Sequence, residues 1–195
     1  MSDTLPSENG EQIGQETSPD LAAAAHWLES RYGFVSNLAR TLAHAPGALT
    51  PWLNLEHYCR FASDLTERQR MVIILVATRD VSYCWPHYRP LARTVGLSDE
   101  QISLVQEGRV PQDLSEVEQV VCRIASEIVS GRQIPHAMYE DIVKLLPPRQ
   151  IVDIAITASF HMAMATLSVG LAVEIEDPEV LKREQGHYKK LIGLA

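Results

Sequence analysis

The residues best suited to proton-transfer chemistry form one cluster at positions 83–88, which reads Tyr-Cys-Trp-Pro-His-Tyr. An apolar run, Met-Val-Ile-Ile-Leu-Val-Ala at positions 71–77, precedes this cluster. Polar groups set against a buried apolar wall acquire shifted pKa values, so a junction of this kind is typical of functional sites. We therefore take His87 as the candidate general acid or base of the protein.

Helical spacing places the partners of His87 close to a helix start. If residues 83–95 are helical, Cys84 and Tyr88 lie on one face because they are four residues apart. Pro86 then lies in the first turn, where its missing N–H costs nothing. Free N–H groups and the helix dipole at this end would stabilise a thiolate on Cys84 or a bound anion. A purely structural alternative makes Cys84 a small buried hydrophobe, Tyr88 a core residue and His87 a satisfied histidine.

Two further histidines are candidates for the same site. His161 lies in an apolar stretch predicted to be helical over residues 149–173, and helices of this kind pack across one another in a bundle. His57 lies just before a second buried helix, predicted over residues 66–80. For each histidine the competing interpretation is a structural role in the core or at an interface. The expected pocket lining consists of Trp85, His57, Met71 and Met162.

No metal-binding or phosphate-binding motif accompanies these residues. The three cysteines, Cys59, Cys84 and Cys122, are widely spaced and form no CxxC pair, which argues against a zinc site or a disulfide framework. The sequence contains no HExxH motif, no glycine-rich phosphate loop and no GxSxG elbow. We therefore expect a site that uses no metal or other cofactor and takes a small-molecule substrate.

Composition and charge narrow the possible partners. The chain has 195 residues, of which 46% are hydrophobic and 22% charged, and its formal net charge is −8. An acidic protein repels phosphate backbones, so we expect no nucleic-acid partner. No apolar run reaches the ~18 to 20 residues that span a bilayer, and the first residues lack a signal-peptide pattern, so we expect a cytoplasmic protein without a membrane partner.

Helix punctuation recurs along the chain, and no segment predicts a strand. Residues 1–20 are acidic and almost devoid of apolar side chains, which indicates a disordered or loosely packed tail. Residues 21–195 then form a single all-α domain, in which Thr50 and Pro51 are expected to open a helix. The capping-box spacing recurs at Thr66 and Gln69, at Ser98 and Gln101, and at Ser115 and Glu118. The predicted helices are two within 21–45, broken near Gly33, and one each at 51–62, 66–80, 83–95, 99–107, 115–130, 136–145, 149–173 and 178–192.

The cluster and its surroundings resemble the carboxymuconolactone decarboxylase family, the larger group that includes the AhpD-like alkylhydroperoxidases. The resemblance covers about residues 34–175. It implies an all-α, AhpD-like multi-helix bundle, a homo-oligomer with extensive helix packing between subunits, and a cofactor-free pocket beside the 83–95 helix. The matching segments are Leu-Thr-Glu-Arg-Gln-Arg at 65–70 with the apolar run at 71–77, the cluster at 83–88, Ala92, Gly-Leu-Ser at 96–98, and Pro-Arg-Gln-Ile-Val-Asp at 148–153 through Gly170.

Several positions depart from the family pattern. Decarboxylase-like relatives, which act on small carboxylated lactones by proton transfer, tend to have Glu where this chain has Cys84 and His where it has Tyr88. His87 therefore lies one residue early. AhpD-like relatives use a CxxC disulfide cycle, and the position three residues before Cys84 is Val81. The chemistry of neither branch transfers directly to this chain.

Three functions remain open on these grounds. The first is a cofactor-independent lyase, isomerase or cyclase that acts on a small carboxylated or lactone-like molecule, with His87 moving the proton. Tyr83, Tyr88 and His161 are its candidate donors, and Cys84 is a polar or thiolate partner. The second is a degenerate member that only binds a ligand or assembles. The third is an alkylhydroperoxidase-like antioxidant protein that uses Cys84 as its reactive thiol.

Overall fold

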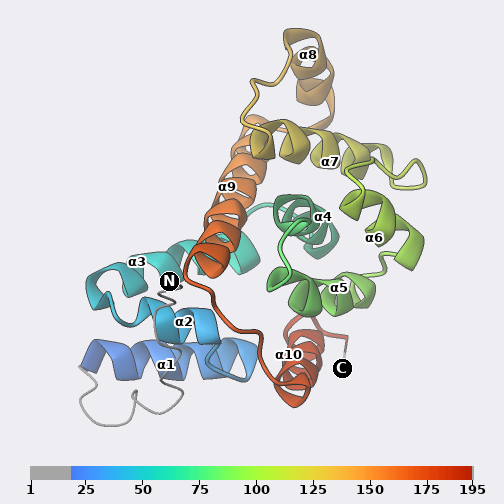
Figure 1. Ribbon diagram of the computed structural model, residues 1–195. Helices are drawn as coiled ribbons and strands as arrows, with labels where there is room; N and C mark the ends of the chain where they lie inside the picture. Colours follow the sequence, from blue (N-terminus) through green and yellow to red (C-terminus); the bar gives the residue numbers. More distant parts are fainter. Residues whose placement is uncertain (1–18, 195) are drawn as a thin grey trace, which may run out of the picture.

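The computed structural model describes residues 19–194, which fold into helices and contain no strand, as expected (Figure 1). The prediction of a disordered tail at residues 1–20 falls almost entirely outside this range. Most predicted helices lie within two residues of the observed bounds. The elements are α1 (Pro19–Tyr32), α2 (Asn37–Leu42), α3 (Pro46–His57), the π-helix η2 (Tyr58–Ala62), α4 (Glu67–Thr78), α5 (Cys84–Thr94), α6 (Asp99–Gln106), α7 (Glu116–Val129), α8 (His136–Leu145), α9 (Pro148–Gly170) and α10 (Pro178–Leu191).

Helix α4 forms the centre of the molecule, with α5, α6, α7 and α9 arranged around it (Figure 1). Its ten residues 69–78 are all buried, which explains why no polar face interrupts the apolar run. A capping box starts the helix, because Thr66 Oγ1 accepts from the Gln69 N–H at 3.2 Å and Gln69 Oε1 accepts from the Thr66 N–H at 2.8 Å. The sequence-predicted buried helix is therefore confirmed.

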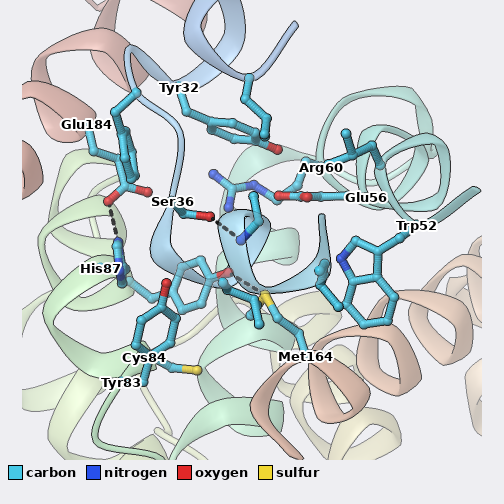
Figure 2. Close-up of a pocket in the computed structure, with 17 residues that line it drawn as sticks. Tyr32, Ser36, Trp52, Glu56, Arg60, Tyr83, Cys84, His87, Met164 and Glu184 are labelled. Atoms are coloured by element: carbon cyan, nitrogen blue, oxygen red, sulfur yellow. Dashed lines mark hydrogen bonds and ion pairs between the residues drawn. The ribbon is translucent and has the colours of Figure 1, made fainter. Parts of the chain in front are cut away.

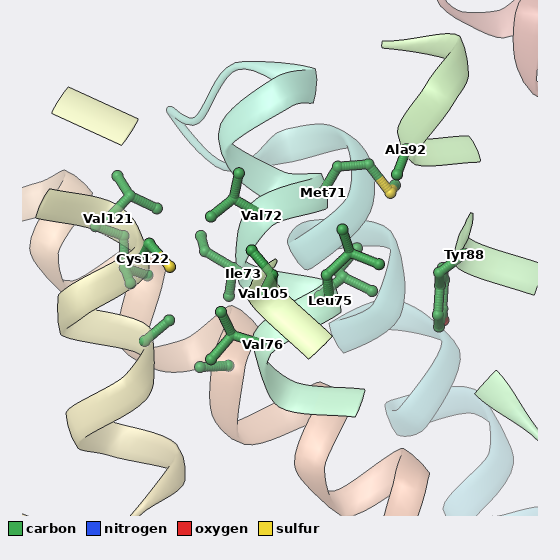
Figure 3. Packing of buried hydrophobic residues seen from close by; sticks show 14 of the residues in the cluster. Met71, Val72, Ile73, Leu75, Val76, Tyr88, Ala92, Val105, Val121 and Cys122 are labelled. Carbon is green, nitrogen blue, oxygen red and sulfur yellow. The ribbon is translucent and has the colours of Figure 1, made fainter. Parts of the chain in front are cut away.

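The core is built on both sides of α4 (Figure 3). Val72 and Ile73 lie toward Val121 and Cys122 of α7, whereas Met71 lies toward Ala92 of α5. Each fully buried side chain of this size contributes roughly 1.5–3 kcal/mol relative to an exposed one. This packing fixes α5, and with it the 83–88 cluster, against a rigid wall.

Helix α3 differs most from expectation. It begins at Pro46, so the prediction of a start at Thr50 and Pro51 is wrong, and Pro51 lies inside the helix. Pro46 takes the first helical position instead, where a missing N–H has no cost. The helix then continues into η2, in which the Ser63 N–H donates to the Tyr58 carbonyl at 3.0 Å, five residues back. Single π-turns of this kind are frequent at functional sites.

The other helix starts and breaks that the sequence predicted are present in the structure. The capping boxes at Ser98 and at Ser115 are both formed. Gly33 has φ +80°, in the left-handed region that L side chains rarely adopt, and it separates α1 from α2 as predicted.

Helix α9 is more apolar than the sequence analysis allowed. It is the one helix within residues 19–194 whose length and composition would suffice to cross a membrane, which corrects the expectation that no such run exists. This is weak grounds for a membrane span, because a core helix has the same composition, and half of the apolar window is buried. Val152 and Val169 of this helix are 55% and 63% exposed. The subunit interface expected on this helix stays a prediction.

Candidate functional site

A cavity of about 60 Å³ lies beside the start of α5 (Figure 2). One water molecule needs roughly 10–15 Å³ of such cavity volume, so the cavity admits a few water molecules or a small organic group. Its walls come from α1, α2, α3, η2, α5, α9, α10 and the α1–α2 connection. The polar or titratable residues in the lining are Tyr32, Ser36, Glu56, Arg60, Tyr83, Cys84, His87, Tyr88 and Glu184.

His87 is held between two carboxylates at one wall of this cavity. Its Nδ1 lies 2.6 Å from Glu184 Oε2, and its Nε2 lies 2.8 Å from Glu176 Oε2. Burial disfavours the charged ring, but the hydrogen bonds and charges of Glu176 and Glu184 outweigh it and raise the pKa of His87 to about 9. At neutral pH the ring is therefore an imidazolium that donates both N–H groups.

The two carboxylates have different surroundings. Glu176 Oε1 accepts from the Asn37 backbone N–H at 2.7 Å and from the Tyr83 hydroxyl at 3.0 Å. Burial raises the pKa of Glu176, but the hydrogen bond and charge of His87, together with the Asn37 N–H, lower it on balance. Glu176 is thus a fixed anion behind the ring. Glu184 instead lines the cavity, and its Oε1 has no hydrogen bond to any residue between 19 and 194.

Helix α10 delivers Glu184 to the site. It packs against α5 and α1, and its face toward the body carries Glu184 and, four residues on, Tyr188. The Tyr188 hydroxyl donates to Glu67 Oε2 at 2.9 Å, which ties α10 to the start of α4. The chain segment 171–177 between α9 and α10 carries Glu176. The trio of His87, Glu176 and Glu184 therefore joins three separate parts of the sequence.

Arg60 is the second unusual group of the cavity. Its side chain comes from η2, is 4% exposed and lies over the rings of Tyr32, Phe61, Tyr88 and Tyr188, with its guanidinium carbon 5.5–5.9 Å from each centroid. Nη2 is buried without a hydrogen-bond partner, and no described carboxylate oxygen lies within 4.0 Å. Desolvating a cation costs several kcal/mol, whereas each ring contact returns about 0.5–2 kcal/mol. The ring contacts therefore offset only part of the free-energy cost of burying the Arg60 guanidinium.

Two neighbours of Arg60 complete that end of the cavity (Figure 2). Tyr32 is 8% exposed, and its hydroxyl has no hydrogen-bond partner of acceptable geometry among the described residues, although Glu56 lies near it. Burial, followed by the charge of Glu56, raises the pKa of Tyr32 well above its ordinary range, so it remains a hydroxyl donor. Burial also raises the pKa of Glu56, and the opposing charge of Arg60 reverses only part of this shift.

Cys84 lines the cavity but lacks the character of a reactive thiol. It is 1% exposed, and burial raises its pKa to about 12. The expectation of a thiolate at this helix start is wrong, because burial holds the thiol in its neutral form. Tyr88 also reaches the cavity, where its hydroxyl donates to Met164 Sδ at 3.5 Å. Tyr83 lines the cavity as well, with its hydroxyl on Glu176.

His161 lies in the core and not on the cavity. It is 1% exposed, its Nδ1 lies 2.8 Å from the Thr157 carbonyl, and burial lowers its pKa to about 3. Its ring meets Tyr88 edge-on, with 5.9 Å between the centroids, and Tyr88 in turn lies 6.5 Å from the His87 ring. The structure therefore does not bring His161 and His87 together as a proton-transfer pair.

The four residues predicted to line the pocket also lie elsewhere. Trp85 donates its indole N–H to the Arg79 carbonyl and does not line the cavity. His57 packs beside Trp27 and Phe61, outside the cavity. Met71 is a core residue, and Met162 lies partly exposed on α9, where Met164 takes the lining position instead. Helix rotation relative to neighbours decides these positions.

Sequence reasoning missed the charged half of the site. Glu184 left a usable signal, because it occupies the apolar stripe of α10 together with Val180 and Tyr188. Arg60 and Glu176 have no such sequence signal, because Arg60 lies in a π-turn and Glu176 lies in the connection between two helices. The residues missed are Tyr32, Glu56, Arg60, Glu176 and Glu184.

The described residues form an all-α protein with the AhpD-like fold, as comparison with solved structures shows. No protein-family model matches the chain, and no curated protein matches it in sequence. Solved structures do match it in fold. An uncharacterized peroxidase-related protein from Silicibacter sp. TM1040 is 17% identical with a TM-score of 0.75, and the match covers 96% of this chain and 100% of that one.

Two further structures extend this likeness. The alkylhydroperoxidase AhpD core of a peroxidase-related protein from Ralstonia eutropha JMP134 is 17% identical, with a TM-score of 0.70 over 85% of this chain and 93% of that one. The debrominase Bmp8 is 13% identical, with a TM-score of 0.68 over 87% of this chain and 92% of its own. Identities this low establish a common fold, which confirms the architecture that the resemblance implied.

Proposed function

We propose that the protein is an acid–base enzyme of the lyase or isomerase type that acts on a small organic molecule in the cavity beside α5. One observation carries this proposal: buried His87 is hydrogen-bonded through both ring nitrogens, and one of its two carboxylate partners, Glu184, opens onto the cavity. Desolvation of such a charged trio is costly, and Glu184 lies where a small molecule in the cavity would meet it. Buried polar networks of this kind are concentrated at functional sites.

Glu184 is the proton acceptor in this proposal, which changes the role expected for His87. The pKa of His87 is about 9, so the ring already carries its proton at neutral pH and cannot act as the base. The carboxylate of Glu184 is free to take a proton through Oε1. The imidazolium orients that carboxylate, and Glu176 with Tyr83 holds the imidazolium in place.

The reaction step balances without an added redox partner. Glu184 accepts a proton from a carbon next to a carbonyl group, and the C–H electron pair moves into the carbonyl to give an enolate. Return of the proton to a different carbon isomerises the molecule, and loss of a leaving group from the enolate gives elimination. Side chains alone carry out these transfers, so the proposal needs no cofactor.

Thiol chemistry is the weaker alternative. A peroxide-reducing cysteine acts as a thiolate and must be reached by its substrate. Burial raises the pKa of Cys84 to about 12, and the pKa values of Cys59 and Cys122 each to about 11. All three thiols are buried. No cysteine in the described part of the chain has the environment that this function requires.

Deuterium exchange on a panel of compounds tests the proposal, so that no single substrate has to be chosen in advance. The protein is incubated in D₂O with small keto acids and lactones, and proton NMR follows loss of the C–H signals. We expect exchange on at least one compound, and Glu184→Gln should lower its rate by about 10²–10⁴-fold. Glu179→Gln, an exposed glutamate on the same helix, is the matched control and should keep the rate. Exchange that survives Glu184→Gln would exclude this mechanism.

A further inference from the structure

The cavity is lined by a buried cation, Arg60, that forms no direct ion pair with a carboxylate of residues 19–194. Arg60 is 4% exposed, and its Nη2 has no hydrogen-bond partner. Four aromatic rings surround the guanidinium and remove its water, but ring faces offer no acceptor oxygen in the plane of the N–H groups. An unpartnered, nine-tenths buried donor at the wall of a cavity points to something that binds there.

A second orphaned donor lies on the same wall. The Tyr32 hydroxyl is buried and lines the cavity together with Arg60. Glu56 lies near this hydroxyl, but no described residue accepts from it with acceptable hydrogen-bond geometry. Figure 2 shows the Tyr32 hydroxyl and the Arg60 guanidinium in the same part of the cavity. Two unpaired donors, one of them cationic, match a group with two acceptor oxygens and a negative charge.

The carboxylates that face the cavity do not already fill this role. Glu184 is engaged with His87 at 2.6 Å, on the His87 side of the cavity. Glu56 has no oxygen within 4.0 Å of the Arg60 nitrogens, so it forms no direct ion pair. Burial raises the pKa of Glu56, and the charge of the nearby Arg60 opposes that shift without a direct ion pair between them.

We propose that Arg60 and Tyr32 form a carboxylate-binding subsite, so that the ligand of this cavity is a small organic monoanion with an apolar body. The carboxylate would accept from Nη2 and from the Tyr32 hydroxyl. The apolar body would contact Leu28, Leu38 and Leu42, which line the same space. This inference deepens the proposed function and rests on it only for the statement that the bound molecule reacts at Glu184.

Binding of paired probes tests the subsite directly. Calorimetry compares acetate, butanoate and benzoate with acetamide, butanamide and benzamide, which have nearly the same shape without the charge. We expect at least one carboxylate to bind about tenfold or more tightly than its amide, since a charge-assisted hydrogen bond supplies that difference. Inorganic phosphate should bind no better than the amides, because it lacks the apolar body. Equal affinity of every carboxylate and its amide would overturn the proposal.

Variants assign the effect to the two donors. Arg60→Met should abolish the preference for carboxylate, and Tyr32→Phe should weaken carboxylate binding several-fold. Tyr58→Phe is the matched control, because its hydroxyl donates to Asp153 and does not line the cavity. Unchanged carboxylate preference in Tyr32→Phe and Arg60→Met would exclude the subsite. If Arg60→Met does not fold, the Tyr32→Phe variant and the probe pairs on the unaltered protein still test whether the subsite exists.

The readout separates this inference from the proposed function. Glu184→Gln, which should lose proton exchange, should still prefer carboxylate over amide because the replaced group is bonded to His87 and to neither donor of the subsite. Carboxylate binding without any proton exchange would contradict the proposed function and leave the subsite intact. Proton exchange without carboxylate preference would contradict the subsite and leave the proposed function intact.

Discussion

His87 Nδ1 lies 2.6 Å from Glu184 Oε2, and this contact joins the start of α5 to the middle of α10 across 97 positions of sequence. On its other side the ring meets Glu176 at 2.8 Å. The imidazolium is therefore both the link that fixes α10 against the body and the group that orients the carboxylate facing the cavity. In the proposed function, the proton on His87 serves both the stability of the fold and the chemistry of Glu184.

Replacing His87 by alanine should destabilise the protein strongly. The substitution leaves two buried carboxylates facing each other without their shared cation, and breaking a buried pair costs about 3–5 kcal/mol. Urea unfolding followed by circular dichroism measures the loss in free energy of unfolding. His44→Ala, at an exposed position that does not line the cavity, is the control and should change it far less. A loss below about 1 kcal/mol for His87→Ala would show that the trio is not a charged unit.

The stability of the protein should fall as the pH rises from neutral to alkaline. The pKa of His87 is about 9 in the folded protein and about 6.5 in an unfolded chain. Because the folded value is the higher one, the stabilisation is complete below pH ~6.5 and disappears as the pH passes about 9. A shift of this size corresponds to about 3 kcal/mol. Unfolding free energies at pH 6 and pH 10 measure it, and His87→Gln should remove this part of the pH dependence.

His161 should act in the opposite direction, at acid pH. Burial lowers its pKa to about 3, against about 6.5 when unfolded, so its neutral ring stabilises the fold above pH ~6.5 and this contribution is lost as the pH falls toward 3. His161→Gln should reduce the acid sensitivity of the protein between these values. Melting temperatures from pH 7 to pH 4 test this. A wild-type curve and a variant curve that stay parallel would contradict it.

The Cys84 thiol should react slowly with alkylating reagents. Its pKa of about 12 leaves almost no thiolate at pH 7, and the side chain is 1% exposed. We expect alkylation by iodoacetamide in the folded protein to be at least ~100-fold slower than in urea, because only the thiolate reacts. Peptide mass spectrometry follows the modification at Cys84, with Cys59 and Cys122 as internal references. Fast modification of Cys84 alone would revive the peroxidase alternative.

Replacing Arg60 by methionine should cost little stability, in contrast to His87→Ala. Arg60 has no ion pair to break within residues 19–194, and replacing buried charges by apolar groups of similar size is often neutral or stabilising. We expect the free energy of unfolding without ligand to change by less than about 1 kcal/mol. Urea titration in buffer free of carboxylates measures this. A large loss would mean that Arg60 is a structural element and would weaken the case for a ligand counter-ion.

Local sequence patterns predicted the elements but not which sides of them face the cavity. The apolar run of α4 required burial on all sides, and the capping boxes at Thr66, Ser98 and Ser115 marked three helix starts correctly. Met71, by contrast, was expected in the pocket and lies in the core. A rotation of one residue along a helix is about 100°, and a pattern that is apolar on every side does not specify it.

The sequence by itself determined that the chain is all-α, that α4 is buried and that His87 lies at the start of the helix beside it. Short-range spacing controls those features, because caps, helix periods and prolines act within a few residues. Only the tertiary structure decided what His87 does. Glu176 and Glu184 lie 89 and 97 positions away, and their approach raises the pKa of His87 so that the ring is charged at neutral pH. Burial likewise decided that Cys84 is an inert thiol, and the packing left Arg60 without a direct ion pair among the described residues.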